Sequence, residues 1–111
     1  MAFNPALTLK DKAIAKTVMA RLEETGKTYF TSDDLRGWLP QDFFDDPQHE
    51  IGAWFARMKW HWYLKRVGEE VSQIESNHKR RVDLWKPTNV MRGWLRSPLL
   101  DVYAAGHNPK V

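Results

Sequence analysis

Residues 46–67 have the sequence DPQHEIGAWFARMKWHWYLKRV, in which the spacing of apolar residues changes from helical to extended. Asp46 and Pro47 are a typical N-cap residue and first helical residue. Apolar side chains then share one narrow helical face, at Ile51, Trp54, Phe55, Met58 and Trp62. The stretch predicts a helix over residues 47–61, followed by a strand over residues 62–67.

The chain before this stretch predicts two further helices with a short strand between them. Apolar residues recur at helical spacing within residues 11–24, and Gly26 ends that helix. Residues 27–30 are aromatic and β-branched, which is typical of a brief strand or an extended linker. Residues 31–34 match a capping box, so a second helix starts there, and Pro40 stops it after about two turns.

The chain after residue 67 predicts a second strand and a helical tail. Residues 80–85 alternate apolar and polar side chains, and Lys86-Pro87 ends the strand. The polar segment between the strands includes Ser76-Asn77-His78, a reasonable hairpin tip. Apolar residues recur on helical faces within residues 88–106, which predicts one or two short helices before a frayed end.

The predicted order is helix, short strand, helix, helix, strand, loop and strand, which is the order of the winged helix-turn-helix. We expect an α+β fold, mostly α, with three helices, a β-hairpin wing and a C-terminal helical tail. Residues 1–9 would form an N-terminal arm, residues 10–87 the winged-helix domain and residues 88–111 the tail. The 111 residues, 42% of them hydrophobic, suffice for one domain with a single modest core.

The six tryptophans have different expected environments. Four belong to the predicted core, namely Trp38, Trp54, Trp62 and Trp85. By helical phase Trp60 points away from the core, where a large exposed ring is unfavourable unless something covers it. Burial of Trp60 by residues 90–95 of the tail or by a second subunit is the favoured interpretation. Stacking of Trp60 and Trp94 on an unpaired base is the alternative.

The charged residues are divided unevenly along the chain. Residues 1–56 carry 6 Lys or Arg and 9 Asp or Glu, whereas residues 57–111 carry 11 and 5. The net charge of +3 therefore comes from a basic second half. This asymmetry indicates that positive charge is concentrated on one surface, which could bind a polyanion, and is not spread over the whole protein.

Several classes of protein are disfavoured by what the sequence lacks. The absence of Cys excludes disulfides and thiolate metal sites, and the four His residues lack ligand spacing, so no metal or cofactor is expected. No nucleotide-binding or hydrolase motif occurs, and the carboxylates of residues 42–46 have no nucleophile nearby, so no enzyme is expected. Neither a signal sequence nor a membrane-length apolar run occurs, which predicts a soluble protein of the prokaryotic or host-cell cytoplasm.

The exposed face of the helix over residues 47–61 is the first candidate site. Its predicted DNA contacts are Gln48, His49, Gly52, Ala53, Ala56, Arg57 and Lys59. The small side chains at its centre allow the helix to approach the major groove closely, and the Gln and His side chains can reach base edges. The two cations lie at its sides, where they can contact phosphates. The alternative is a face that packs against the tail or against a second subunit.

The predicted hairpin is the second candidate site. Its cations are His78, Lys79, Arg80 and Arg81, opposite Lys65 and Arg66 on the paired strand. Phosphate contacts by this cluster would release counterions and add to the salt dependence of binding. The alternative is a solvated β-edge that charge protects from aggregation. Glu69, Glu70 and Glu75 in the same hairpin weaken the phosphate interpretation.

Residues 47–55, 64–68 and 76–85, with the sequences PQHEIGAWF, LKRVG and SNHKRRVDLW, resemble small winged-helix proteins of bacteriophages and prokaryotic mobile elements. In that group, a Pro-rich or polar helix start precedes an aromatic, Gly-containing recognition helix, a Gly-Leu-Ile type strand and a wing that closes on a Val-x-x-Trp or similar strand. The resemblance covers about residues 10–87, and its loose motifs support the fold more than the function. The chain departs from the pattern at Trp62, where the third helix of the group usually ends on Gly.

The expected function is binding of double-stranded DNA by the winged helix, as a viral or mobile-element transcription regulator or nucleoid-associated accessory protein. A homodimer through the C-terminal tail would supply the affinity that one module lacks. One alternative is a protein-interaction module, such as a phage inhibitor of a host protein, which docks through an acidic loop with Phe43 and Phe44 exposed. Another is binding of single-stranded nucleic acid through Trp60 and Trp94.

Overall fold

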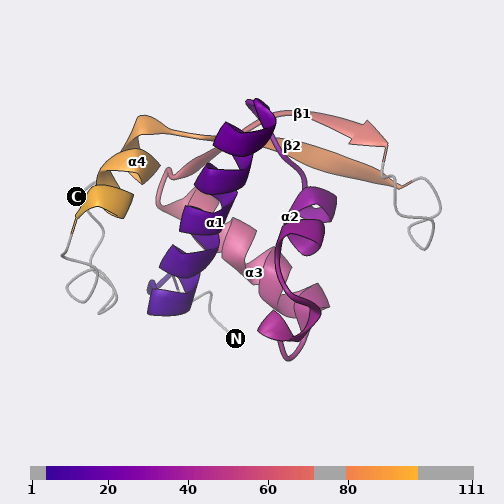
Figure 1. The fold of residues 1–111 in the computed structure, drawn as a ribbon, viewed down its shortest axis with the longest axis horizontal. Helices are drawn as coiled ribbons and strands as arrows, with labels where there is room; N and C mark the ends of the chain where they lie inside the picture. The colour runs from indigo at the N-terminus through magenta and orange to yellow at the C-terminus, as the bar shows by residue number, and fades with distance from the viewer. Residues whose placement is uncertain (1–4, 72–79, 98–111) are drawn as a thin grey trace.

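Four α-helices and a two-stranded antiparallel hairpin make up the described part of the computed structural model, which comprises residues 5–71 and 80–97 (Figure 1). In chain order the elements are α1 (Leu9–Thr25), α2 (Ser32–Trp38), the 3₁₀ segment η1 (Gln41–Phe43), α3 (Pro47–Trp60), β1 (Leu64–Val71), β2 (Arg81–Pro87) and α4 (Asn89–Arg96). The fold class is α+β and mostly helical, as predicted. The hairpin extends to one side of the helices, and α4 lies beside α1 (Figure 1).

Threonine side chains begin three of these helices. The Thr8 hydroxyl accepts a hydrogen bond from the Asp11 backbone N–H at 3.0 Å, and the Asp11 carboxylate accepts one from the Thr8 N–H at 3.1 Å. The same capping box joins Thr31 and Asp34, which confirms the predicted start of α2. Thr88 caps α4 through its hydroxyl. Each cap satisfies an N–H group that the first helical turn leaves without an intrahelical partner.

A single bridge ties the α1–α2 connection to the hairpin. Gly26 ends α1 with φ 73°, a left-handed conformation that a residue without a Cβ adopts at little cost. The Phe30 N–H then donates to the Trp85 carbonyl at 2.9 Å, and the Trp85 N–H donates to the Phe30 carbonyl at 2.8 Å. The brief strand predicted over residues 27–30 is therefore present as one bridge to β2.

One hydrophobic core joins the helices and the hairpin. Its buried side chains include Leu7, Ile14, Val18, Phe30, Leu35, Ile51, Trp54, Phe55, Met58, Tyr63, Trp85, Met91 and Trp94, with Trp38 packed against them. The predicted inward face of α3 is confirmed except at Trp62. Because the core includes Leu7 from the predicted arm and Trp94 from the predicted tail, both segments pack against the middle of the chain.

Both strands of the predicted hairpin are present, with shifted ends. The strands pair from Leu64 opposite Pro87, and the register is irregular after Arg66. β1 begins at Leu64 rather than at Trp62, and β2 continues to Pro87. The tip predicted at residues 76–78 lies outside the described residues.

The end of α3 explains why β1 starts late. The Trp62 N–H donates to the Lys59 carbonyl at 3.0 Å, and the Tyr63 N–H donates to the Met58 carbonyl at 2.8 Å. These two bonds form a Schellman motif, in which the residue at the position of Trp62 is left-handed and usually Gly. Trp62 has φ 65°, and its side chain is 63% exposed. The prediction that Trp62 packs in the core is wrong, because the left-handed residue breaks the helical phase and turns the ring outward.

We expect Trp62→Gly to be more stable than Trp62→Ala by about 1 kcal/mol, because a left-handed residue with a Cβ is strained and Gly is not. Both variants lack the indole ring, so they lose the same packing. Urea unfolding of the two variants measures the difference. Ala20, at an exposed helical position in α1, provides the control, because Ala20→Gly should lower stability there. Equal or greater stability of Trp62→Ala would contradict the assignment of the left-handed cap.

The helix predicted around residues 90–95 is confirmed, and α4 covers one end of the core. The ring of Trp94 is 3% exposed and stacks on Tyr63, with 4.5 Å between ring centroids. Trp94 is therefore not available to stack on an unpaired base, contrary to the single-strand alternative. The second tail helix, predicted to follow Ser97-Pro98, and the predicted frayed end lie outside the described residues.

Candidate nucleic-acid interface

The solvent-facing side of α3 carries most of the predicted contact residues. Gln48, His49, Gly52, Ala56 and Lys59 are exposed, and Ala53 is half-buried. A Cβ added at Gly52 would meet no atom within 4 Å, beyond the neighbouring helix backbone. Ala53 lies toward α1, where it lines a hollow with Asp11 and Arg57, so the part of this face that is open to a large partner is at Gly52 and Ala56.

Two carboxylates flank the N-terminal end of this face. The Asp46 carboxylate contacts His49 Nδ1 instead of capping the helix, and this hydrogen bond lowers the pKa of Asp46. Glu50 accepts a hydrogen bond from the Asp46 N–H at 2.7 Å and pairs with Lys10 of α1 at 3.2 Å, and both contacts lower its pKa. The His49 side chain must therefore break its hydrogen bond with the Asp46 carboxylate before it can reach a base edge.

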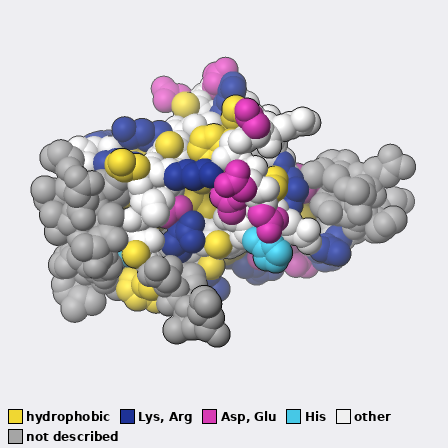
Figure 2. All heavy atoms as spheres, turned by 90° about the horizontal axis from the view of Figure 1, so that it is seen from below, with side chains coloured by type: hydrophobic (Ala, Val, Ile, Leu, Met, Phe, Trp, Pro, Cys, Tyr) yellow, Lys and Arg dark blue, Asp and Glu magenta, His cyan; other side chains and the backbone are white. Residues whose placement is uncertain are grey.

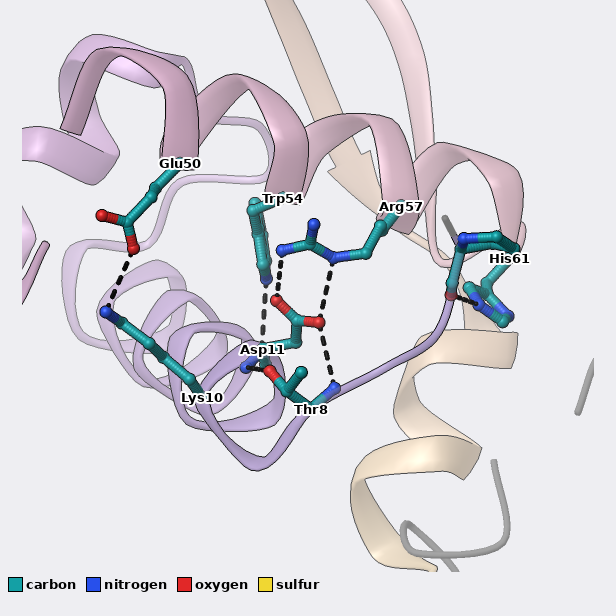
Figure 3. A network of polar contacts seen from close by, with 8 residues as sticks. Thr8, Lys10, Asp11, Glu50, Trp54, Arg57 and His61 are labelled. Atoms are coloured by element: carbon teal, nitrogen blue, oxygen red, sulfur yellow. Dashed lines mark hydrogen bonds and ion pairs between the residues drawn. The ribbon is translucent and has the colours of Figure 1, made fainter. Parts of the chain in front are cut away.

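Arg57 lies on a different face of α3, turned toward α1 (Figure 3). Its guanidinium donates to the Asp11 carboxylate at 2.7 and 3.0 Å, and Trp54 Nε1 donates to the Asp11 carbonyl at 3.1 Å. The Asp11 side chain is 2% exposed and that of Arg57 is 22% exposed. Because Arg57 forms an ion pair inside the fold, we leave it out of the proposed contact surface.

The described arginines of the hairpin strands are paired with hairpin carboxylates. Arg66 contacts Asp83 at 2.8 Å and Glu69 at 3.3 Å, and Arg81 contacts Glu69 at 3.4 Å. Figure 2 shows a similar mixture of cations and carboxylates on the face of the molecule seen from below. Of the predicted wing contacts, Arg80 and Arg81 are exposed, whereas His78 and Lys79 lie outside the described residues.

A groove of about 960 Å³ lies between the C-terminal half of α3 and the root of the hairpin. Its lining residues are Ala56, Lys59, Trp60, Trp62, Leu64, Lys65, Arg66 and Thr88. Trp60 is 40% exposed in this groove, so α4 does not provide the cover that the sequence predicted for it. The groove combines two exposed indole rings with three cations.

A second hollow of about 330 Å³ adjoins the groove, because Lys65 and Thr88 line both. It adds Lys86, which pairs with Lys65 across the hairpin, and Arg92 from the first turns of α4. We name Lys59, Lys65, Lys86 and Arg92 the basic track. Within residues 5–71 and 80–97, none of these four side chains forms an ion pair.

The predicted site did not include Trp62, Lys86 and Arg92. The hairpin register carried the signal for Lys86, since a strand that ends at Pro87 brings Lys86 opposite Lys65. Arg92 follows Thr88 by one helical turn, so recognition of Thr88 as a cap would have placed it near the hairpin root. The signal for Trp62 in the sequence was a Trp at a position where Gly is usual in the winged-helix proteins that the sequence resembles.

His61 is completely buried, and its ring is in edge-to-face contact with the Trp60 ring, with 4.8 Å between the ring centroids. Its Nε2 lies 2.7 Å from the Pro5 carbonyl, so the neutral ring donates from Nε2, and Nδ1 carries a lone pair. Within the described residues Nδ1 has no hydrogen-bond partner. Burial lowers the pKa of His61 below its ordinary value of 6.5, against smaller opposing effects of the Pro5 carbonyl and Asp11.

The free energy of unfolding is expected to fall as the pH drops below 6.5, because the unfolded chain then binds a proton that folded His61 does not. The loss continues until the pH reaches the lowered pKa of the folded state. Urea unfolding of the parent and of His61→Gln at pH 7.5, 6.0 and 5.0 isolates this contribution. The parent should lose more stability than His61→Gln over that range. Parallel pH profiles for the parent and His61→Gln would contradict the assignment.

Comparison of the chain with models of known protein families, with curated proteins and with solved structures gives no match. Among the described helices, none is long and apolar enough to cross a membrane. No cluster of three or more His, Cys, Asp or Glu residues in the same part of the chain could hold a metal ion. The geometry of the α3 face and the neighbouring groove is therefore the basis for a functional proposal.

Proposed function

We propose that this chain is a winged-helix protein that binds double-stranded DNA, with α3 in the major groove and the hairpin as its wing. The observation that carries the proposal is the open small-residue face of α3 at Gly52 and Ala56, beside a groove lined with cations. A helix can enter the major groove when no bulky side chain holds its axis away from the bases. The exposed amide of Gln48 lies at the end of α3 from which recognition helices usually contact bases.

The arrangement of the elements supports the winged-helix assignment. Three helices precede the hairpin, and the bridge from Phe30 adds a third strand-like segment beside β2. This is the element order that the sequence predicts for a winged helix-turn-helix. The resemblance to proteins of bacteriophages and mobile elements extends the proposal to a transcription regulator or an accessory protein in DNA transactions.

Phosphate contacts are proposed at the root of the hairpin as well as along it. Arg66 and Arg81 would have to exchange the hairpin carboxylates for phosphates, which reduces the net gain from either contact. The basic track carries no such competing ion pair within the described residues. It is therefore the stronger candidate for counterion release on binding.

A dimer through the tail would rest on residues 98–111, which lie outside the described part of the chain. Met91 and Trp94 of α4 are buried inside their own domain and are not free to pair with a second copy. The proposed homodimer thus needs a surface other than the apolar face of α4. Without a dimer, one domain contacts few base pairs, and modest affinity is expected.

The acidic loop does not form the exposed aromatic epitope that the protein-interaction alternative requires. Phe44 is 7% exposed, and Phe43 packs against the core. The Lys10 ammonium of α1 lies 5.0 Å and 5.2 Å from the centroids of the two rings. The expectation that both Phe side chains are exposed is wrong, because the loop folds back against α1.

Salt titration of binding to a blunt duplex of about 20 base pairs tests the proposal, because each phosphate contact adds about −0.9 to the slope of log K against log salt concentration. We expect Lys65→Ala and Lys86→Ala each to make the slope shallower by about one unit. Lys16→Ala, at an exposed position on α1, is the matched control and should leave it unchanged. Absence of binding at low salt, or a slope that neither track variant alters, would contradict duplex binding at this surface.

A further inference from the structure

Trp60 and Trp62 present two indole rings to solvent in the same groove. Trp62 does so from a left-handed backbone conformation, with φ 65°, which bulky residues rarely adopt. A Gly at this position would cap α3 without strain. The sequence therefore places a large apolar ring at an exposed site and accepts backbone strain to do so, a combination associated with ligand contact.

The charges around these rings restrict the ligand. Lys59 and Lys65, which form no ion pair within the described residues, line the same groove, and Lys65 also lines the hollow that holds Lys86 and Arg92. A matching ligand has flat apolar groups for the indoles and negative charges repeated along its length for the cations. An unpaired nucleic-acid strand has this chemistry, since its bases stack on aromatic side chains while its phosphates contact cations.

A second copy of this chain fits the groove less well. Docking of two such grooves against each other would bring Lys59 and Lys65 of both copies together, and like charges at an interface oppose association. A nucleic-acid strand instead neutralises these charges. The charge of the lining thus favours a polyanion as the occupant.

We propose that this groove binds unpaired nucleobases at the end of a DNA strand, so that the protein prefers a duplex with a short single-stranded extension to a blunt duplex. The proposal rests on duplex binding by α3 and adds the class of DNA substrate. The duplex lies on the open face of α3, the unpaired bases stack on Trp60 and Trp62, and the basic track contacts phosphates on both sides of the junction between the duplex and the extension.

Three DNA probes with the same duplex test the proposal by fluorescence anisotropy: one blunt, one with a short thymidine extension, and one with an abasic extension of equal length. We expect the thymidine extension to tighten binding about tenfold over the blunt duplex, the usual scale for stacking of one base. The abasic extension, which keeps the phosphates, should gain clearly less. Equal affinity for the thymidine and abasic probes would overturn base stacking, as would equal affinity for all three probes, which would point to a protein occupant of the groove.

Variants of the two rings complete the test. Trp60→Ala and Trp62→Gly should each abolish the preference for the thymidine extension, and Trp62→Gly should leave binding to the blunt duplex within about twofold, because Trp62 lies beyond the C-terminal end of α3. Tyr29→Ala removes a 47% exposed ring outside the groove and should retain the preference. An unchanged preference in both Trp variants would overturn the proposal. Failure of the parent to bind any blunt duplex would instead refute duplex binding by α3, so the two proposals fail in distinguishable ways.

Discussion

Arg57→Ala is expected to lower the free energy of unfolding by about 3–5 kcal/mol, because it leaves the Asp11 carboxylate buried without its charged partner. Asp11 is 2% exposed and accepts two hydrogen bonds from the guanidinium of Arg57, at 2.7 and 3.0 Å. A domain of this size is typically stable by about 5–15 kcal/mol, so the loss would be a large part of the total. Urea or thermal unfolding measures it.

The control for Arg57→Ala is Arg21→Ala, which removes the exposed pair between Arg21 and Glu24 of α1. Exposed pairs contribute about 0–1 kcal/mol, so this variant should unfold close to the parent. A double-mutant cycle with Asp11→Ala separates the pair from its surroundings, and the double variant should lose less than the sum of the single losses. If Arg57 were a phosphate contact instead, Arg57→Ala would weaken DNA binding and leave stability unchanged.

Local patterns in the sequence predicted the elements that depend on neighbouring residues. The capping box of Thr31 and Asp34 and the stop at Gly26 involve residues within one turn of each other, and the structure has both. The inward face of α3 was also predictable, because the apolar side chains repeat with the period of the helix. The exposed small-residue face was predictable for the same reason, because it lies on the side of α3 opposite the apolar side chains.

The environments of several other residues depend on contacts that the sequence pattern does not contain. Arg57 lies at the edge of the apolar face, and its partner Asp11 is distant in the chain. Phe43 and Phe44 are covered by Lys10, again from α1. Trp62 fits the helical period, but the sign of its φ angle decides its direction, and no periodicity reveals that sign.

Gly52→Glu is expected to weaken binding to a blunt duplex at least about thirtyfold, because a buried carboxylate facing DNA without a partner costs roughly 2 kcal/mol or more. The fold should persist, since a Cβ at Gly52 meets no atom within 4 Å beyond the neighbouring helix backbone. Replacement of a helical Gly should even raise stability by about 0.5–1 kcal/mol. Weaker binding together with higher stability would show that the loss of binding comes from a lost DNA contact and not from unfolding.

Two variants act as controls for Gly52→Glu. Gly52→Ala adds a methyl group of the size already present at Ala53 and Ala56, and it should gain similar stability while binding the duplex within about threefold of the parent. Ala20→Glu adds the same charge at an exposed position on α1, so it reports the effect of net charge alone. Only Gly52→Glu should show the large loss.

The most direct test of duplex binding through α3 is the dissociation constant of a blunt duplex for the parent, Gly52→Ala, Gly52→Glu and Ala20→Glu, measured at one salt concentration. Binding through the open face of α3 predicts that the parent, Gly52→Ala and Ala20→Glu bind with similar affinity while Gly52→Glu loses at least about thirtyfold. Equal binding by Gly52→Glu and Ala20→Glu would contradict it, because the open face would then not touch DNA.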